Sequence, residues 1–205
     1  MRPPAAALAL GLVLALAAPA HAKPVIVALG DSITSGLGVT ADEAYPALLE
    51  ARLRREGYAY RVVNAGVSGD TTAGGLRRVD WILRAEPEIV IVALGANDGL
   101  RGQRPATTRA NLETIVGRLR VAGTRVLLAG MRMPPNYGEA FTREFAAVFP
   151  AVARRLNVAL VPFLLDGVAA DPTLNQPDGI HPNAAGHRMI AERLWPHLRP
   201  LLKKP

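Results

Sequence analysis

A serine stands at the point where an apolar segment of this sequence ends. The run 25–29 is followed at once by Gly30, Asp31 and Ser32. A nucleophile must be held on a rigid element with its oxygen exposed, and the end of a strand provides that position. Asp31 and Ser32 also suit the N-cap of a helix. A catalytic role for Ser32 therefore requires a base, an orienting acid and oxyanion donors elsewhere in the chain.

The candidates for base and orienting acid share one short loop near the C-terminus. His181 follows Asp178 by three residues, Gly179 lies between them, and Pro182 favours extended backbone at His181. Such a loop can hold the carboxylate of Asp178 against one ring nitrogen of His181 and turn the other outward, as a serine nucleophile requires. Taken alone, this spacing also fits a turn that precedes a helix.

The remaining histidines fit the role of base less well. His21 lies in the N-terminal segment, and His187 and His197 fall in the expected last helix, where we expect exposed or half-buried positions. No further group of Asp, Glu or His residues supplies enough ligands for a metal ion. We therefore expect no metal and no other cofactor.

Donors for an oxyanion are expected after the second and third apolar runs. Gly69, in VSGDT, can bring its backbone N–H close to a substrate because no side chain blocks the approach. Asn97, in GAND, can donate from its carboxamide, and the Ser32 N–H lies at the start of a helix or turn, where amides are unpaired. Gly69 and Asn97 also suit ordinary turns. Asp31 and Asp98, beside two of these donors, are expected to fix their own turns.

Short apolar runs alternate with helical patterns after the N-terminal segment. The runs are rich in Val, Ile and Leu and are continuous, as in strands covered on both faces. They span residues 25–29, 61–64, 88–94, 125–129 and 158–163. Strands separated by helices form right-handed βαβ units. We predict one domain over residues 23–205, a flavodoxin-like three-layer α/β/α sandwich with a mainly parallel five-stranded sheet, whose ligand lies beyond the carboxyl ends of the strands.

Apolar residues recur at helical spacing between these runs. Pro150 interrupts one such stripe, which predicts a bent or divided helix there. The stripes are formed by Leu48, Leu49 and Leu53, by Leu112, Ile115, Val116 and Leu119, by Phe141, Phe145, Val148 and Val152, and by Ile190, Leu194 and Leu198.

The first 22 residues have the pattern of a signal peptide. Arg2 precedes a short alanine-rich apolar stretch, and AHA at 20–22 fits a small-residue cleavage site. We expect cleavage near Ala22 and a periplasmic or secreted bacterial protein, and a retained membrane anchor is the alternative. The sequence has no cysteine, so a secreted form depends on its core without disulfides.

The net charge of +7 does not indicate a nucleic-acid partner. The excess consists mainly of scattered arginines that are not interleaved with aromatic residues. These are Arg52, Arg54, Arg55, Arg77, Arg78, Arg154 and Arg155. Transient contact with an anionic lipid surface is kept as an alternative, and we expect a monomer.

Four short blocks, spread over nearly the whole chain after residue 22, carry a family resemblance. GDSIT, SGDT, GAND and DGIHPN, in this order, resemble the SGNH or GDSL-type hydrolases. The longer stretches VALGDSITSGLGV, NAGVSGDTTAGGLRR, LGANDGLRG and MRMPPNYG resemble the branch of bacterial periplasmic arylesterases, thioesterases and lysophospholipases. Ile33 and Thr34 stand where that family commonly has Leu and Ser, and neither change removes a catalytic atom.

The resemblance implies a role for each candidate residue. Ser32 would be the nucleophile, and Asp178 and His181 would complete the triad. Gly69 and Asn97 would join the Ser32 N–H in the oxyanion hole. The implied reaction is hydrolysis of an ester or thioester through an acyl-enzyme, without a cofactor.

Apolar residues near these blocks are candidates for an acyl groove, although they also suit packing under a loop. They are Leu100, Met131, Met133, Pro134 and Tyr137. The predicted substrates are aryl esters, fatty acyl esters, acyl thioesters and lysophospholipids. A carbohydrate O-deacetylase with the same triad is the alternative enzyme, but it would need aromatic sugar platforms, and only 5% of the residues are aromatic. A non-catalytic nucleotide-binding module is a further alternative, but GDSITSGLG lacks both G-x-G-x-x-G and a P-loop lysine.

Overall fold

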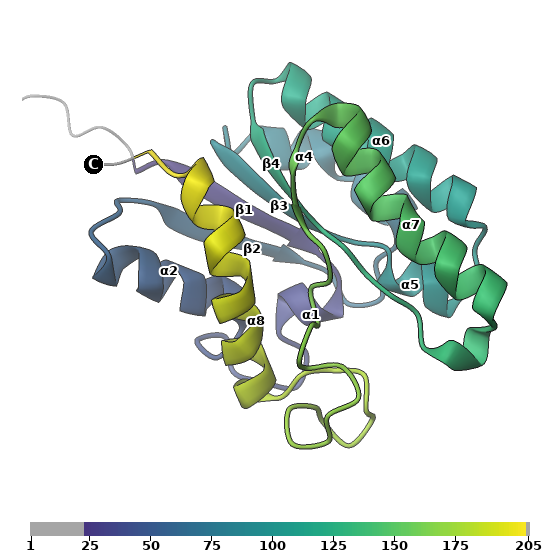
Figure 1. Cartoon of the computed structure of the whole chain (residues 1–205). Coiled ribbons are helices and arrows are strands. Elements are labelled where there is room, and N and C mark those ends of the chain that lie inside the picture. The colour runs from purple at the N-terminus through teal and green to yellow at the C-terminus, as the bar shows by residue number, and fades with distance from the viewer. Residues whose placement is uncertain (1–22, 204–205) are drawn as a thin grey trace, which may run out of the picture.

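The computed structural model describes residues 23–203, and the predicted leader, residues 1–22, lies outside the described residues. A five-stranded parallel sheet with the order β2-β1-β3-β4-β5 forms the centre (Figure 1). The strands are β1 (Val25–Gly30), β2 (Arg61–Gly66), β3 (Ile89–Ala93), β4 (Arg125–Ala129) and β5 (Ala159–Val161). All five carboxyl ends point to one edge of the sheet.

Three adjacent strands end at the same level of this sheet. Gly30 of β1, the middle one of these three strands, pairs with Gly66 of β2 on one side and with Ala93 of β3 on the other. The segments that follow these strands therefore begin side by side, although they are far apart in the sequence.

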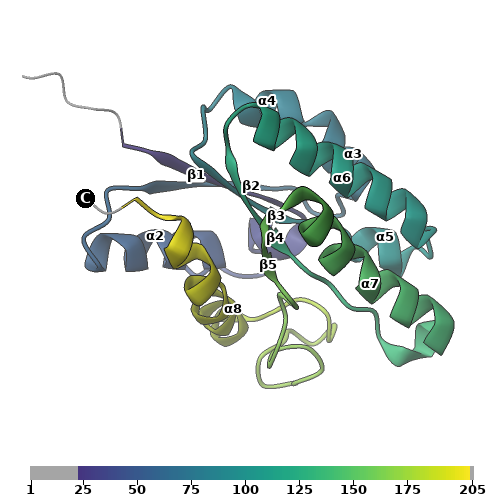
Figure 2. The same ribbon diagram turned by 45° about the horizontal axis from the view of Figure 1, so that its top comes forward.

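Helices cover both faces of the sheet. They are α1 (Ser32–Ser35), α2 (Tyr45–Arg55), α3 (Thr72–Arg77), α4 (Val79–Leu83), α5 (Ala96–Leu100), α6 (Pro105–Val121), α7 (Glu139–Leu156) and α8 (Ala184–Leu198), with the 3-10 helices η1 (Pro135–Tyr137) and η2 (Arg199–Leu201). α2 and α8 lie on one face, and α3, α4, α6 and α7 lie on the other (Figure 2). The predicted three-layer architecture is confirmed. From residue 23 to 203, no helix has both the length and the apolar character needed to cross a membrane.

The core lies between the sheet and these helices. β1 and β3 are buried along their whole length, and the predicted stripes of α6 and α8 are buried in the same core. β2 is an edge strand and is partly exposed, so the prediction of strands covered on both faces is wrong for β2. β5 ends before Pro162, shorter than predicted, because proline has no N–H to continue the ladder.

Pro150 does not divide α7, which is continuous from Glu139 to Leu156. Proline removes one backbone hydrogen bond, here the bond to the carbonyl of Ala146. Ala146 and Pro150 are both partly exposed, so water can reach that carbonyl. Burial of the neighbouring Phe145 and Phe149 favours the continuous form.

His187 is buried, whereas an exposed or half-buried position was predicted. It lies against the N-terminus of α2 and accepts a hydrogen bond from it. Only 1% of its surface is exposed, and its Nδ1 accepts from the Tyr45 N–H at 3.3 Å. The N-cap residue of α2, Ala44, has no side-chain acceptor for this amide, so His187 supplies one from α8. Burial lowers the pKa of His187 to about 4, against the opposing effect of Glu43.

We expect His187→Asn to flatten the pH dependence of stability. The pKa of His187 falls from 6.5 to about 4 on folding, so the unfolded chain binds more protons in this window and stability falls as pH drops below 6.5. The loss reaches about 3 kcal/mol near pH 4. Asn keeps an acceptor for the Tyr45 N–H and does not titrate.

Free energies of unfolding in urea, measured for both proteins at about pH 7.5 and pH 4.5, test this expectation. Other titrating groups contribute equally to the two proteins, so the difference between them isolates His187. An equal loss of stability in the variant would contradict the assignment.

Candidate active site

Ser32 is mounted at the junction between β1 and α1. The Oδ1 of Asp31 accepts from the Ile33 N–H at 3.1 Å and so caps the single turn that begins with Ser32. Ser32 is the first residue of α1, where the backbone N–H has no partner within the helix. The prediction that Asp31 fixes its turn is confirmed.

The structure brings His181 to Ser32 across 149 residues of sequence. His181 Nε2 lies 2.9 Å from Ser32 Oγ, and His181 Nδ1 lies 2.6 Å from Asp178 Oδ2. The other carboxylate oxygen of Asp178 accepts from the backbone N–H groups of Ile180 and His181, each at 3.0 Å. These bonds, with the His181 backbone N–H foremost, lower the pKa of Asp178 to about 2. The carboxylate thus stays ionised beside the ring and fixes its orientation.

Gln176 ties the loop that carries His181 to the segment after Ser32. Its side-chain amide donates to the carbonyl of Leu37 at 2.6 Å and to the carbonyl of Pro182 at 3.0 Å. Its backbone N–H donates to the carbonyl of His181 at 2.8 Å. One residue therefore holds His181 in place beside Ser32.

Gly69 and Asn97 lie at the ends of the strands on either side of β1. Gly69 is the third residue of a turn closed by a 3.0 Å bond from the Asp70 N–H to the Val67 carbonyl. Its φ of 78° is a conformation that favours glycine. Within residues 23–203, no protein acceptor is bound to the Gly69 N–H. Asn97 Nδ2 donates to the Asp70 carbonyl at 2.9 Å, and its other contact, with Asp31 Oδ2 at 3.5 Å, is too long to compete strongly with a ligand for the second hydrogen.

Asp98 joins the loop that carries Gly69 to the loop that carries Asn97. It is fully buried, and its carboxylate accepts from the Thr72 N–H at 2.8 Å and from the Thr72 hydroxyl at 2.5 Å. Thr72 is the first residue of α3, which follows the Gly69 turn. Asp98 therefore braces the Asn97 loop, as predicted, by tying α5 to α3.

Ser32, Gly69, Asn97 and His181 all line one cavity of about 550 Å³. Asp178 does not line it and holds the ring of His181 from the side. A cavity of this size is in the range of pockets that take small organic molecules.

The predicted acyl-groove residues divide into two groups. Leu100, Met131, Met133 and Pro134 line the cavity. Tyr137 is not part of the wall, and its hydroxyl instead donates to the Leu100 carbonyl at 3.1 Å. Tyr137 thus supports the wall from behind, because η1 turns its ring toward α7.

The long loop between β5 and α8 supplies a wall that sequence reasoning missed. This loop carries apolar side chains that reach the cavity, and Leu37 completes the wall from the segment after α1. The loop residues are Phe163, Leu165, Ala169, Ala170 and Ile180. The available signal was the number of apolar residues in a loop that was expected only to deliver Asp178 and His181. Among the described residues, no three His, Cys, Asp or Glu side chains are grouped to hold a metal ion.

Comparison with known proteins identifies the family. The model of the GDSL-like Lipase/Acylhydrolase family matches residues 28–189. The chain belongs to this family. The matched range includes Ser32, Gly69, Asn97, Asp178 and His181, and the resemblance carried by the short blocks is confirmed.

Similar proteins cover nearly the whole chain. Esterase TesA of Pseudomonas aeruginosa is 45% identical over 192 residues, which are 93% of this chain and 96% of that protein. Thioesterase 1/protease 1/lysophospholipase L1 of Escherichia coli K12 is 39% identical over 184 residues, which are 89% of this chain and 87% of that protein. A crystal structure of TesA superposes with a TM-score of 0.84 and 46% identity, and covers 87% of this chain and 99% of that one.

One carboxyl group of this GDSL-type site is buried at an energetic penalty. Asp31 is 2% exposed, and burial raises its pKa to about 6, although the Ile33 N–H and the charge of His181 favour its ionised form. Asp70 is a further negative charge that raises it. Asp31 Oδ2 lies 3.5 Å from Asn97 Nδ2, too far for a strong hydrogen bond.

We expect Asp31→Asn to stabilise the protein at alkaline pH. The pKa of Asp31 rises from 3.8 to about 6 on folding, so its favourable contribution is present below 3.8 and is lost as pH rises through 6. A neutral amide keeps the cap on the Ile33 N–H and avoids the buried charge. The variant should gain about 1–3 kcal/mol in free energy of unfolding at pH 8, and the gain should vanish near pH 4. Urea unfolding at both pH values measures it, and a gain independent of pH would rule out ionisation as its source.

Proposed function

We propose that this chain is a serine ester hydrolase that cleaves carboxylic esters and thioesters through an acyl-enzyme. The observation that carries the proposal is the 2.9 Å contact of Ser32 Oγ with His181 Nε2 at the wall of an apolar cavity. Asp178 on the far side of the ring completes the arrangement that a serine nucleophile needs.

The reaction has two steps. Ser32 Oγ attacks the substrate carbonyl carbon while His181 Nε2 takes its proton, and Asp178 stabilises the resulting imidazolium. The negatively charged oxygen of the tetrahedral intermediate accepts hydrogen bonds from the backbone N–H groups of Ser32 and Gly69 and from the side-chain amide of Asn97. The alcohol or thiol leaves with the proton from His181, and water then cleaves the acyl-enzyme with the same residues acting again.

The substrate class follows from the cavity and from the relatives. The wall of the cavity is mainly apolar, and Leu100, Met131 and Met133 are suited to contact an acyl chain or an aryl group. Relatives named esterase and thioesterase/lysophospholipase support fatty acyl esters, aryl esters, acyl thioesters and lysophospholipids as substrates.

The proposed setting is outside the cytoplasm of a bacterium. The signal-peptide pattern of residues 1–22, with a cleavage expected near Ala22, supports this setting. We propose a monomer that contacts lipid surfaces transiently. Leu37, Leu100 and Ile180 support that contact, because they are exposed and line the cavity.

Ser32→Ala should abolish labelling by a fluorophosphonate probe and hydrolysis of p-nitrophenyl esters, because both require an activated serine.

Asn97→Ala should keep the labelling site but lower kcat by about 10²–10³-fold, as expected for loss of an oxyanion donor. Labelled protein on a gel and steady-state kinetics measure the two effects. Labelling that persists in Ser32→Ala, or full kcat in a folded Asn97→Ala protein, would contradict these roles.

Ala169→Trp should shorten the range of acyl chains that the enzyme accepts. Ala169 lines the cavity, so the indole ring of a tryptophan there should fill part of it. The value of kcat/KM should fall by about tenfold for p-nitrophenyl decanoate and stay nearly unchanged for the acetate ester. Ala147→Trp, at an exposed position of α7, is the matched control. A wild-type enzyme that accepts only acetyl esters would contradict the proposal that the cavity binds long acyl chains and would favour the carbohydrate O-deacetylase.

A further inference from the structure

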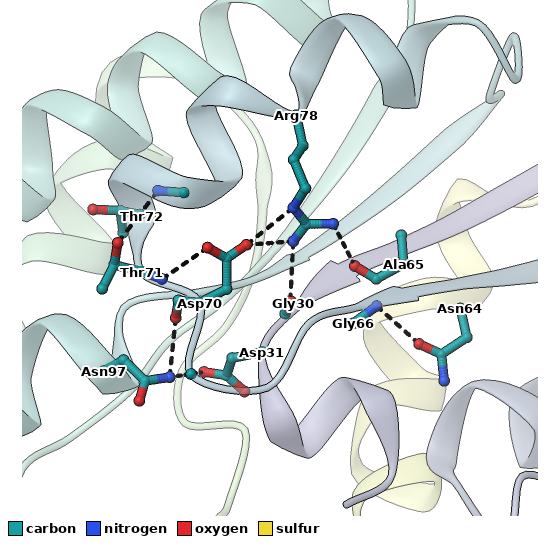
Figure 3. Close-up of polar contacts among 12 residues, drawn as sticks. Gly30, Asp31, Asn64, Ala65, Gly66, Asp70, Thr71, Thr72, Arg78 and Asn97 are labelled. Atoms are coloured by element: carbon teal, nitrogen blue, oxygen red, sulfur yellow. Dashed lines mark hydrogen bonds and ion pairs between the residues drawn. The ribbon is translucent and has the colours of Figure 1, made fainter.

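Arg78 is not a scattered surface charge. Its side chain is 22% exposed and pairs with Asp70, whose side chain is 11% exposed. Asp70 Oδ2 accepts from Arg78 Nε at 3.0 Å and from Arg78 Nη2 at 2.5 Å (Figure 3). A forked, charge-assisted pair of this kind fixes direction as well as distance.

The same guanidinium also reaches the ends of two strands. Arg78 Nη1 donates to the carbonyl of Ala65 in β2 at 2.8 Å, and Nη2 lies 3.3 Å from the carbonyl of Gly30 in β1 (Figure 3). Gly30 is followed by Asp31 and Ser32. One side chain thus contacts the strand that carries the nucleophile, the neighbouring strand, and the loop that follows that strand.

Asp70 transmits this position to two oxyanion donors. Its N–H closes the turn in which Gly69 presents its amide, and its carbonyl accepts from Asn97 Nδ2 at 2.9 Å. A shift of Asp70 would therefore move the Gly69 amide and release the Asn97 carboxamide. Neither Asp70 nor Arg78 lines the cavity, so they act on a substrate only through these donors.

The helix beside Asp70 is shaped for this carboxylate. A Cβ at Gly74 of α3 would lie 1.6 Å from Asp70 Oδ1, so only glycine allows the close approach. Asp70 Oδ1 also accepts from the Thr71 N–H at 3.1 Å. The carboxylate is held from both sides and has little freedom to rotate.

We propose that Arg78, through Asp70, is a positioning residue that holds the oxyanion donors in register with Ser32. This inference rests on the proposed ester hydrolysis. The positive charge of Arg78 also offsets the carboxylate of Asp70, which would otherwise oppose the negative charge that develops in the transition state. The pair therefore acts on kcat rather than on binding of the substrate.

Arg78→Met should lower kcat for p-nitrophenyl esters by about 10–100-fold and change KM by less than about threefold. Arg78→Lys should lower kcat by about tenfold, because an ammonium cannot make the fork and both carbonyl contacts together. Asp70→Asn, which removes the charge but keeps the shape of the side chain, should resemble Arg78→Lys. Arg118→Met is the matched control, since Arg118 pairs with Asp80 of the nearby α4 but reaches no strand end, and its kcat should equal that of the wild type.

A double-mutant cycle separates positioning from simple stabilisation. With Asn97 replaced by Ala, one of the donors held by Asp70 is gone, so Arg78→Met should lower kcat by only about threefold more. Thermal melting of each protein shows that the variants are folded at the assay temperature. If Arg78→Met does not fold, the same cycle is read with Arg78→Lys and Asp70→Asn.

Three results would overturn the inference. They are a wild-type kcat in folded Arg78 variants, a rise in KM alone, and a fully additive loss in the Asn97→Ala background. Failure of the proposed function is distinct, because it requires a wild-type protein that neither hydrolyses esters nor reacts with the fluorophosphonate probe.

Discussion

The common level at which β1, β2 and β3 end is the constraint on which the site depends. One carbonyl oxygen must lie about 3 Å from each of several N–H donors, whereas neighbouring strands are separated by about 4.8 Å. The pairing of Gly30 with Gly66 and with Ala93 starts three loops at the same edge. Each loop then needs only a few residues to bring its donor over the end of β1.

An aspartate adjoins each of the three proposed donors and fixes the loop that carries it. Asp31 caps α1 beside Ser32, Asp70 holds Arg78 beside Gly69, and Asp98 binds Thr72 beside Asn97. Carboxylates hold loops well because they accept several N–H bonds, but they also place negative charge around a site that must stabilise an anion. The protein handles each charge differently: burial raises the pKa of Asp31, a guanidinium neutralises Asp70, and two bonds from Thr72 satisfy Asp98.

The sequence allowed prediction of what is local and not of what depends on contacts between distant segments. The apolar runs and the polar residues at their ends predicted the sheet, and the spacing of Asp178 and His181 predicted their contact. The burial of His187 escaped prediction, because it depends on α8 lying against an uncapped α2. Arg78 escaped for the same reason, since a charge count cannot show that three separate acceptors converge on one side chain.

The two halves of the site differ in how firmly they are built. The proposed oxyanion donors lie at strand ends and in short helices, where they need not reorganise as charge develops. The proposed base, His181, lies in a long loop, which Gln176 and the Asp178 turn hold in place. That loop also forms a wall of the cavity, and Ile180 stands next to His181. In the proposed reaction, an acyl chain packed against Ile180 would contact the same loop that carries His181, so binding remote from the carbonyl would act on the segment that holds the proposed base.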